Sequence, residues 1–156
     1  MNRDVVVLIG SGSIGQAIAR RVGAGKHVVL ADLRQEAANT AAKILEDAGF
    51  ETSTIAVDIS SRESIKKLIE HAQQLGQIKN LINAAGVSPS QAPVAAILKV
   101  DLYGTAVLIE EFGKVIAEGG SGVIIMPGLI ALIVAPRLPQ AVDSYITRNP
   151  LQRLEY

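Results

Sequence analysis

The sequence predicts an α/β fold in which a doubly wound parallel sheet is covered by helices on both faces. Short apolar runs alternate regularly with segments whose apolar residues recur at helical spacing. Runs of this kind are typical of parallel strands that are covered on both faces. A glycine-rich turn, Gly10 to Gly15, joins the first run to the first helical segment. At 156 residues the chain is expected to form one domain.

The predicted elements follow in order along the chain. Five apolar runs predict parallel strands at residues 5–9, 28–31, 52–57, 81–83 with their neighbours, and 123–126. Apolar faces at helical spacing predict helices around residues 14–22, 41–48 and 65–75, and a fourth helix over 94–117. Right-handed crossovers bring the loops that follow these strands to one edge of the sheet.

The glycine turn predicts a dinucleotide site of the Rossmann type. Gly10 permits a tight turn after the strand, Gly12 lets bare backbone approach a pyrophosphate, and Gly15 lets the helix pack closely on the sheet. A glycine pattern alone is weak evidence, but here strand, turn, helix, second strand and acidic end follow one another. The residues expected to contact the cofactor in this unit are Gly10, Ser11, Gly12, Ser13, Ile14, Gly15, Asp32 and Leu33.

Asp32 predicts which dinucleotide is bound. It ends the second strand, 22 residues after Gly10, where a carboxylate can accept both hydroxyls of an adenosine ribose. The same charge repels a 2′-phosphate, so we expect NAD(H) to be preferred over NADP(H). Arg34 lies two residues further on and in principle favours the phosphate. We interpret Arg34 as a surface residue at the start of the next helix.

Composition excludes several other classes of protein. Fifteen basic and fifteen acidic residues cancel, which leaves no overall attraction to nucleic acid or to an anionic membrane. The absence of cysteine excludes a disulfide framework and a thiolate nucleophile. His27 and His71 lie far apart, so we expect no metal site and assign both to the surface. The start of the chain does not resemble a signal peptide, and a cytoplasmic protein is expected.

Two loops after later strands carry further signals. Asp58-Ile59 follows the third strand, and Ser60 with Glu63 is predicted to form a capping box, which leaves Asp58 for a group such as an adenine amino group. Asn83-Ala84-Ala85-Gly86 follows the fourth strand, and its small residues let a ligand lie against the backbone. A simple turn at the strand end is the alternative there. The cofactor contacts expected in these loops are Asp58, Ile59, Ala84, Ala85 and Gly86.

Together these residues resemble the short-chain dehydrogenase/reductase family. Asp58 matches its adenine-contacting aspartate, and Asn83-Ala84-Ala85-Gly86 is similar to its NNAG motif with one asparagine replaced by alanine. Asp101-Leu102-Tyr103-Gly104-Thr105 is similar to its N-x-x-G segment on the long central helix. The resemblance covers residues 4–126. The glycine turn departs from it, because this chain has GxGxxG where the family usually has TGxxxGxG.

The resemblance implies an NAD(P)-dependent oxidoreductase that acts on a small alcohol or ketone. In the family, hydride passes between nicotinamide C4 and a carbinol carbon, and a tyrosine acts as general acid and base. A lysine four residues later lowers the pKa of that tyrosine, a serine polarises the substrate oxygen, and an asparagine holds a water in the proton relay. The family also implies homo-oligomers that form through the long helix.

The chain has no clean copy of these four catalytic groups. Asp101 occupies the asparagine position, and Met126-Pro127-Gly128 occupies the serine position. Tyr145 is the candidate for the tyrosine, with Asn149 at the lysine position, and Pro150 disfavours helix there. Tyr145 and Asp101 therefore stay candidates for a catalytic role. The alternative for Tyr145 is a surface tyrosine in an irregular tail, and Asp101 can still accept hydrogen bonds but brings a charge.

The end of the chain departs furthest from the pattern. We divide the chain into a dinucleotide-binding domain, residues 1–126, and a divergent tail of the same domain, residues 127–156. Leu129 to Ala135 is apolar and is predicted either to fold back as an antiparallel strand or to continue as another buried strand. The second half of the fold is thus incomplete. Three hypotheses stay open: an NAD-dependent enzyme, a non-catalytic NAD(H)-binding module, and a truncated family member.

Overall fold

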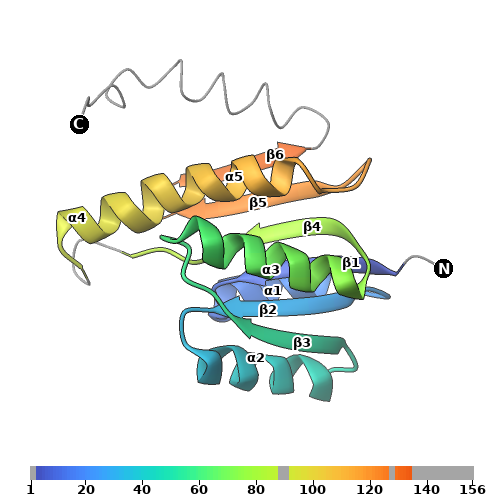
Figure 1. Ribbon diagram of the computed structural model, residues 1–156. Helices are drawn as coiled ribbons and strands as arrows, with labels where there is room; N and C mark the ends of the chain where they lie inside the picture. The colour runs from blue at the N-terminus through green and yellow to red at the C-terminus, as the bar shows by residue number, and fades with distance from the viewer. Residues whose placement is uncertain (1–2, 88–91, 127–128, 135–156) are drawn as a thin grey trace.

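The computed structural model describes residues 3–87, 92–126 and 129–134. These residues form a six-stranded sheet with helices on both faces (Figure 1). The strands are β1 (Asp4–Ile9), β2 (His27–Asp32), β3 (Glu51–Ala56), β4 (Gln77–Asn83), β5 (Ser121–Met126) and β6 (Leu129–Val134). The helices are α1 (Ser13–Val22), α2 (Gln35–Asp47), α3 (Arg62–Leu75), α4 (Val94–Ile97), the π-helical segment η1 (Leu98–Gly104) and α5 (Thr105–Gly113).

The strand order is β3-β2-β1-β4-β5-β6, and the first five of these strands run parallel. The predicted fold class, a doubly wound sheet of Rossmann type, is confirmed. The chain moves outward from β1 to β3, returns to the other side of β1 as β4, and continues outward from there. The loops after β1 and β4 therefore diverge at the point where ligands bind in open α/β sheets.

Two apolar cores hold the helices against the sheet. Val5, Val7 and Ile9 of β1 face α3 and α5, where they meet Leu68 and Phe112 among others. The alternate β1 residues, Val6 and Leu8, face α1 and α2 with the inward residues of β2. The β1 side chains from Val5 to Ile9 are fully buried. This burial on both faces explains why the run is continuously apolar instead of alternating.

The last strand resolves one alternative left open by the sequence. Strand β6 pairs antiparallel with β5, in a register that sets Met126 opposite Leu129 and Ser121 opposite Val134. The apolar run after β5 thus folds back at the sheet edge. Figure 1 shows β6 beside β5, on the opposite side of the sheet from β3. The residues that join the two strands, 127 and 128, lie outside the described residues.

The predicted long helix changes pitch in its middle and ends earlier than predicted. It runs over 94–113 instead of 94–117, and its middle seven residues are π-helical. Beyond the helix end the amide of Ala117 donates a 2.9 Å hydrogen bond to the carbonyl oxygen of Ile78 on β4. That bond draws the chain back to the sheet within a few residues of Gly113.

The assignment of His27 to the surface was wrong. Its side chain is buried at the start of β2, with 7% of the residue exposed. The ring Nε2 lies 3.0 Å from Ser53 Oγ on β3, and Nδ1 lies 3.3 Å from Arg3 Nη1. His71, on α3, is half-buried. Within the described residues no cluster of side chains is suited to hold a metal ion, and no helix is long and apolar enough to cross a membrane.

Candidate functional site

The glycine turn packs tightly against the loop that follows β4. Gly10 has φ +84°, and a Cβ atom there would lie 2.5 Å from the backbone nitrogen of Ala85. At Gly15 a Cβ atom would lie 2.7 Å from both the carbonyl oxygen of Gly10 and Cδ1 of Leu8. Both distances are far below a normal contact, so these positions have the geometry predicted for the turn and for close packing of α1 on the sheet.

Gly12 has a different environment. A Cβ atom there would have no neighbour within 4 Å, and the residue is exposed. Gly12 is the N-cap of α1, and no side chain caps this end of the helix. The backbone amides that open α1 are therefore left for another acceptor, and the helix dipole favours an anion there.

A pocket of about 460 Å³ lies between this turn and the start of α2. Four of its lining residues, Ser11, Gly12, Asp32 and Arg34, come from the segments singled out in the sequence. Arg34 is exposed, as predicted, but it lines the pocket as well. The remaining lining residues could not be predicted, because they lie on α1 and α2 with ordinary helical spacing: Gln16, Glu36, Ala37, Thr40 and Ala41.

Asp32 is held by three hydrogen bonds at the rim of this pocket. Its Oδ2 accepts from the hydroxyl of Ser11 at 2.6 Å and from the amide of Ser11 at 3.0 Å. Its Oδ1 accepts from the amide of Arg34 at 3.1 Å. Burial alone would raise the pKa of Asp32, but the bonds from Ser11, then the amide and charge of Arg34, outweigh it, and the pKa lies below its usual value. The carboxylate is ionised at neutral pH.

Two large apolar side chains stand out from the surface beside these segments. Leu33, next to Asp32, is 71% exposed, and Ile14, in the glycine turn, is 61% exposed. Exposure of single apolar residues is common in proteins. Both lie within two residues of a pocket-lining residue in the sequence, although neither lines the pocket itself.

The predicted capping box before α3 was wrong by one residue. The N-cap is Ser61, whose hydroxyl oxygen accepts from the amide of Ser64 at 3.3 Å. Ser60 instead turns back to Asp58 and donates from its amide (2.9 Å) and its hydroxyl (2.7 Å) to Oδ1. Asp58 is therefore engaged in a local turn and is not freed by a Ser60 cap. Its neighbour Ile59 is buried.

The loop after β4 lies directly under the glycine turn. The amide of Ala84 donates 2.7 Å to the carbonyl oxygen of Ile9, and the amide of Ala85 donates 3.2 Å to Oδ1 of Asn83. Asn83 is fully buried. Gly10 passes against the backbone of Ala84 and Ala85, and the side chain of Ala84 lies close to Gly15. Gly86 follows and is exposed.

Asp101 lies in the π-helical segment and faces the same loop. Its Oδ1 accepts from the amide of Val87 at 3.0 Å. Gly104, at the end of this segment, is buried, and a Cβ atom there would lie 2.6 Å from the carbonyl oxygen of Ile59. The segment thus brings together the loops after β3 and β4. A π-helical stretch is rare and is found frequently at functional sites.

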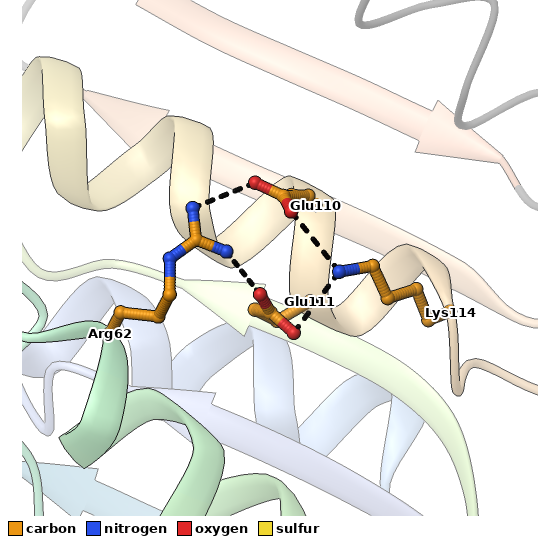
Figure 2. A network of polar contacts seen from close by, with 4 residues as sticks. All are labelled: Arg62, Glu110, Glu111 and Lys114. Carbon is orange, nitrogen blue, oxygen red and sulfur yellow. Dashed lines mark hydrogen bonds and ion pairs between the residues drawn. The ribbon is translucent and has the colours of Figure 1, made fainter.

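A network of four charged residues fastens α3 to α5 beside this segment (Figure 2). Arg62 pairs with Glu110 at 2.8 Å and with Glu111, and Lys114 pairs with the same two carboxylates at 3.1 and 3.3 Å. The hydrogen bonds from Arg62 and Lys114 lower the pKa of Glu110 to about 2. Glu111 is 8% exposed, and its charge is compensated by both cations. This network could not be predicted from the sequence, because Arg62 and Glu110 are 48 residues apart.

The structure brings the residues of the first βαβ unit and of the loops after β3 and β4 to one edge of the sheet. Tyr145 lies outside the described residues, as do residues 127–128 of the expected serine position. The described part of the site is therefore the part that the sequence assigned to a dinucleotide.

The fold and this site define the class of the protein. Residues 4–128 match the family described as short chain dehydrogenase, and the chain belongs to that family. It is 39% identical over 149 residues to the short-chain dehydrogenase/reductase bsc3 of Alternaria brassicicola, covering 96% of this chain and 54% of the relative. It is 29% identical to 3beta-hydroxysteroid dehydrogenase 2 of Eggerthella lenta, covering 86% of this chain and 56% of the relative.

Solved structures show the same fold. The actinorhodin polyketide ketoreductase F189W variant with NADPH has a TM-score of 0.62 at 24% identity, over 70% of this chain and 46% of that one. A Serratia marcescens short-chain dehydrogenase/reductase variant has a TM-score of 0.64 at 23% identity, over 76% and 52%. The chain spans about half the length of the curated relatives it matches.

Proposed function

We propose that this chain is the dinucleotide-binding part of a short-chain oxidoreductase that prefers NAD(H) to NADP(H). The observation that carries the proposal is the ionised carboxylate of Asp32 in a pocket that Gly12 also lines. The open space above Gly12 and the uncapped start of α1 fit a pyrophosphate. Residues 1–126 form the cofactor-binding domain in this proposal, and residues 127–156 are its divergent tail.

Each part of the site has a role in holding the cofactor. The amides that follow Gly12, in Ser13 and Ile14, would bind the pyrophosphate close to the bare backbone of Gly12, while Gly15 would keep α1 packed against the sheet. Asp32 would accept the adenosine ribose hydroxyls, and Leu33 would cover the adenine. Oδ1 of Asp58 is already engaged by Ser60, so an adenine amino group would be accepted by the other oxygen, Oδ2. Ile59 and the small residues after β4 would form the floor: Ala84, Ala85 and Gly86.

The chemistry that a bound nicotinamide supplies is hydride transfer to or from a small alcohol or ketone. This chain's own contribution in the described residues is to bind and orient that group and to hold Asp101 near the loop after β4. Asp101 and Tyr145 stay candidates for the acid–base step. Asp101 reaches the amide of Val87 in the described structure, which gives it a positioning role in this proposal.

A second function, a binding module that holds NAD(H) without turnover, is favoured by one specific observation. Neither Tyr103 nor Tyr145 is followed four residues later by lysine: the residue at that spacing is Val107 after Tyr103 and Asn149 after Tyr145. Absorbance at 340 nm (roughly, the band of reduced nicotinamide) distinguishes the two functions with a panel of secondary alcohols. Turnover supports the enzyme, and binding without turnover supports the module.

A second copy of the chain is the partner that we propose, with the cytoplasm as its compartment. Val94, Leu98 and Leu102 lie four residues apart along the helix, and 70%, 38% and 39% of each is exposed. A stripe of this kind is suited to pack against the same helix of a partner. Analytical ultracentrifugation tests the assembly, and a monomer at tens of micromolar (roughly the weak limit for a specific dimer) would contradict it.

The cofactor assignment is tested by calorimetric titration with NAD⁺ and NADP⁺. We expect micromolar affinity for NAD⁺, about −8 kcal/mol, and much weaker binding of NADP⁺. Asp32→Asn should weaken the binding of NAD⁺ and reduce the difference in affinity between NAD⁺ and NADP⁺. Glu36→Gln is a matched control, because it removes another carboxylate from the same pocket. If Glu36→Gln changes the preference and Asp32→Asn does not, the assignment of Asp32 is wrong. Binding of neither cofactor by the unmodified chain contradicts the proposed function.

A further inference from the structure

Ser11 has all of its polar groups engaged in the structure. Its hydroxyl and its amide both donate to Oδ2 of Asp32, at 2.6 and 3.0 Å. Its carbonyl oxygen accepts from Nε2 of Gln16 at 2.7 Å. Only 7% of the residue is exposed. Ser11 is therefore a fixed bridge from the glycine turn, after β1, to the end of β2.

This bridge determines how Asp32 can meet a ligand. A carboxylate oxygen accepts about two hydrogen bonds, so Oδ2 is filled by Ser11. Oδ1 accepts one hydrogen bond, from the amide of Arg34, and can accept a second. We propose that Ser11 is the positioning residue for Asp32, fixing the carboxylate so that Oδ1 is presented to the ribose of NAD(H). This inference rests on the proposed function and names a residue that governs cofactor choice within it.

The bridge also divides the glycine turn into two functional parts. Because the amide of Ser11 is bound to Asp32, it does not point to the phosphates. The pyrophosphate then depends on the amides from Gly12 onward, where α1 has no side-chain cap. Ser11 serves the ribose side of the site and residues 12–14 serve the phosphate side. The lowered pKa of Asp32, to which the hydroxyl of Ser11 contributes more than the amide does, agrees with this role.

The first test measures Asp32 directly in the chain without cofactor. The carboxyl carbon of Asp32 is titrated by NMR in the unmodified chain and in Ser11→Ala, Ser11→Thr and Ser13→Ala. We expect Ser11→Ala to raise the pKa of Asp32, and Ser11→Thr, which keeps a hydroxyl, to restore it. Ser13→Ala removes an exposed hydroxyl from the same turn and should leave the titration unchanged. The inference is overturned if Ser11→Ala leaves the pKa of Asp32 unchanged, or if Ser11→Thr raises this pKa as much as Ser11→Ala does. Neither result depends on whether the chain binds a cofactor.

The second test measures cofactor discrimination and its pH dependence. We expect Ser11→Ala to bind NAD⁺ about tenfold more weakly at neutral pH, the scale of one lost bond to a charged group, and to reduce the NAD⁺-to-NADP⁺ affinity ratio. Binding of NAD⁺ should be lost at a higher pH than in the unmodified chain, since protonated Asp32 loses an acceptor. In one outcome the unmodified chain binds NAD⁺ while Ser11→Ala leaves both the NAD⁺-to-NADP⁺ affinity ratio and the pH profile of binding unchanged. That result contradicts the role of Ser11 and leaves the proposed function standing. An unmodified chain that binds neither cofactor contradicts the proposed function.

Discussion

The carboxylate of Asp101 accepts a 3.0 Å hydrogen bond from the backbone amide of Val87 and so ties the π-helical segment to the loop after β4. The family resemblance places an asparagine at this position. An aspartate and an asparagine can both accept this bond through Oδ1, so the substitution preserves the tether. It replaces a neutral amide by a charged group at the same place. The geometry therefore gives Asp101 a structural task that does not depend on catalysis.

Two substitutions of Asp101 are expected to distinguish the effect of its hydrogen bond with Val87 from the effect of its charge. Asp101→Ala should leave the Val87 amide without this acceptor and speed its hydrogen exchange by about tenfold, the scale of one hydrogen bond of ~1.4 kcal/mol. Asp101→Asn should retain the protection. Amide exchange followed by NMR measures both. Equal protection of Val87 in the alanine variant would show that the bond does not hold the loop.

The three glycines of the turn are expected to respond differently to alanine. Gly10→Ala and Gly15→Ala place a Cβ atom 2.5 to 2.7 Å from backbone or side-chain atoms. Overpacking of this kind costs about 1–3 kcal/mol, and Gly10→Ala adds strain at φ +84°. Gly12→Ala meets open space and should lose less stability than the other two variants, since only the weaker N-cap preference of alanine opposes it. It should still weaken NAD⁺ binding, because the methyl occupies the phosphate side.

Urea unfolding and calorimetry are the measurements for this series. If Gly12→Ala loses as much stability as Gly15→Ala, the open environment of Gly12 is contradicted. If it folds and binds NAD⁺ as the unmodified chain does, the phosphate side of the proposed site is contradicted instead. The first outcome tests the open space around Gly12, and the second tests the role of Gly12 in binding the phosphates.

The network between α3 and α5 is expected to be sensitive to acid. Arg62, followed by Lys114, lowers the pKa of Glu110 to about 2 from an ordinary 4.5. A carboxylate with a lowered pKa in the folded state stabilises above its ordinary pKa, and that stability is lost as the pH falls from 4.5 towards 2. Thermal unfolding is measured at pH 7 and pH 3.5, and the melting temperature should fall less between them in Glu110→Gln than in the unmodified chain. An equal fall in both chains would show that the protonation of Glu110 does not contribute to the loss of stability in acid.

The two glutamates of this network are expected to differ at neutral pH. Glu111 is 8% exposed and pairs with both cations, whereas Glu110 has a half-exposed side chain. Glu111→Gln should therefore lower the melting temperature more than Glu110→Gln, because fewer water molecules can replace the lost ion pairs. Equal melting temperatures would show that burial does not distinguish the two pairs.

The first βαβ unit could be predicted closely because its signals are local. The apolar run, the glycine spacing and the acidic strand end lie within 32 consecutive residues, and each acts through its own neighbours. The predicted strand over 28–31 is observed as His27–Asp32, one residue longer at each end. Antiparallel β6 was one of two predicted alternatives, and its pairing with β5 follows from the short connection between two apolar runs.

Other features could not be predicted because distant contacts decide them. The sequence predicted Ser60 as the cap of α3, but Ser60 bonds to Asp58 and the observed N-cap is Ser61. The pitch change at Leu98–Gly104 has no local signal. Ser11 could be placed in the turn, but its bond to Asp32 depends on how β1 and β2 lie side by side.

His27 is expected to make stability fall in mild acid. Burial, followed by the charge of Arg3, lowers the pKa of its imidazole, and His71 acts in the same direction, while Glu51 opposes them. A histidine whose pKa is lower in the folded than in the unfolded state binds a proton on unfolding. Stability is then constant well above the unfolded pKa of about 6.5 and falls as the pH drops through it, by at most about 1.4 kcal/mol per pH unit for one proton.

His27→Gln tests this expectation, because glutamine cannot be protonated yet can still hydrogen-bond to Ser53. Urea unfolding between pH 7.5 and pH 5.5 (roughly one unit on either side of the unfolded pKa) should show a fall in the unfolding free energy of the unmodified chain and a smaller fall in the variant. Glu51→Gln removes the group that favours the charged ring, so it should enlarge the fall. If His27→Gln shows the same fall as the unmodified chain, another group carries the pH dependence and the buried pairing of His27 with Ser53 does not control it.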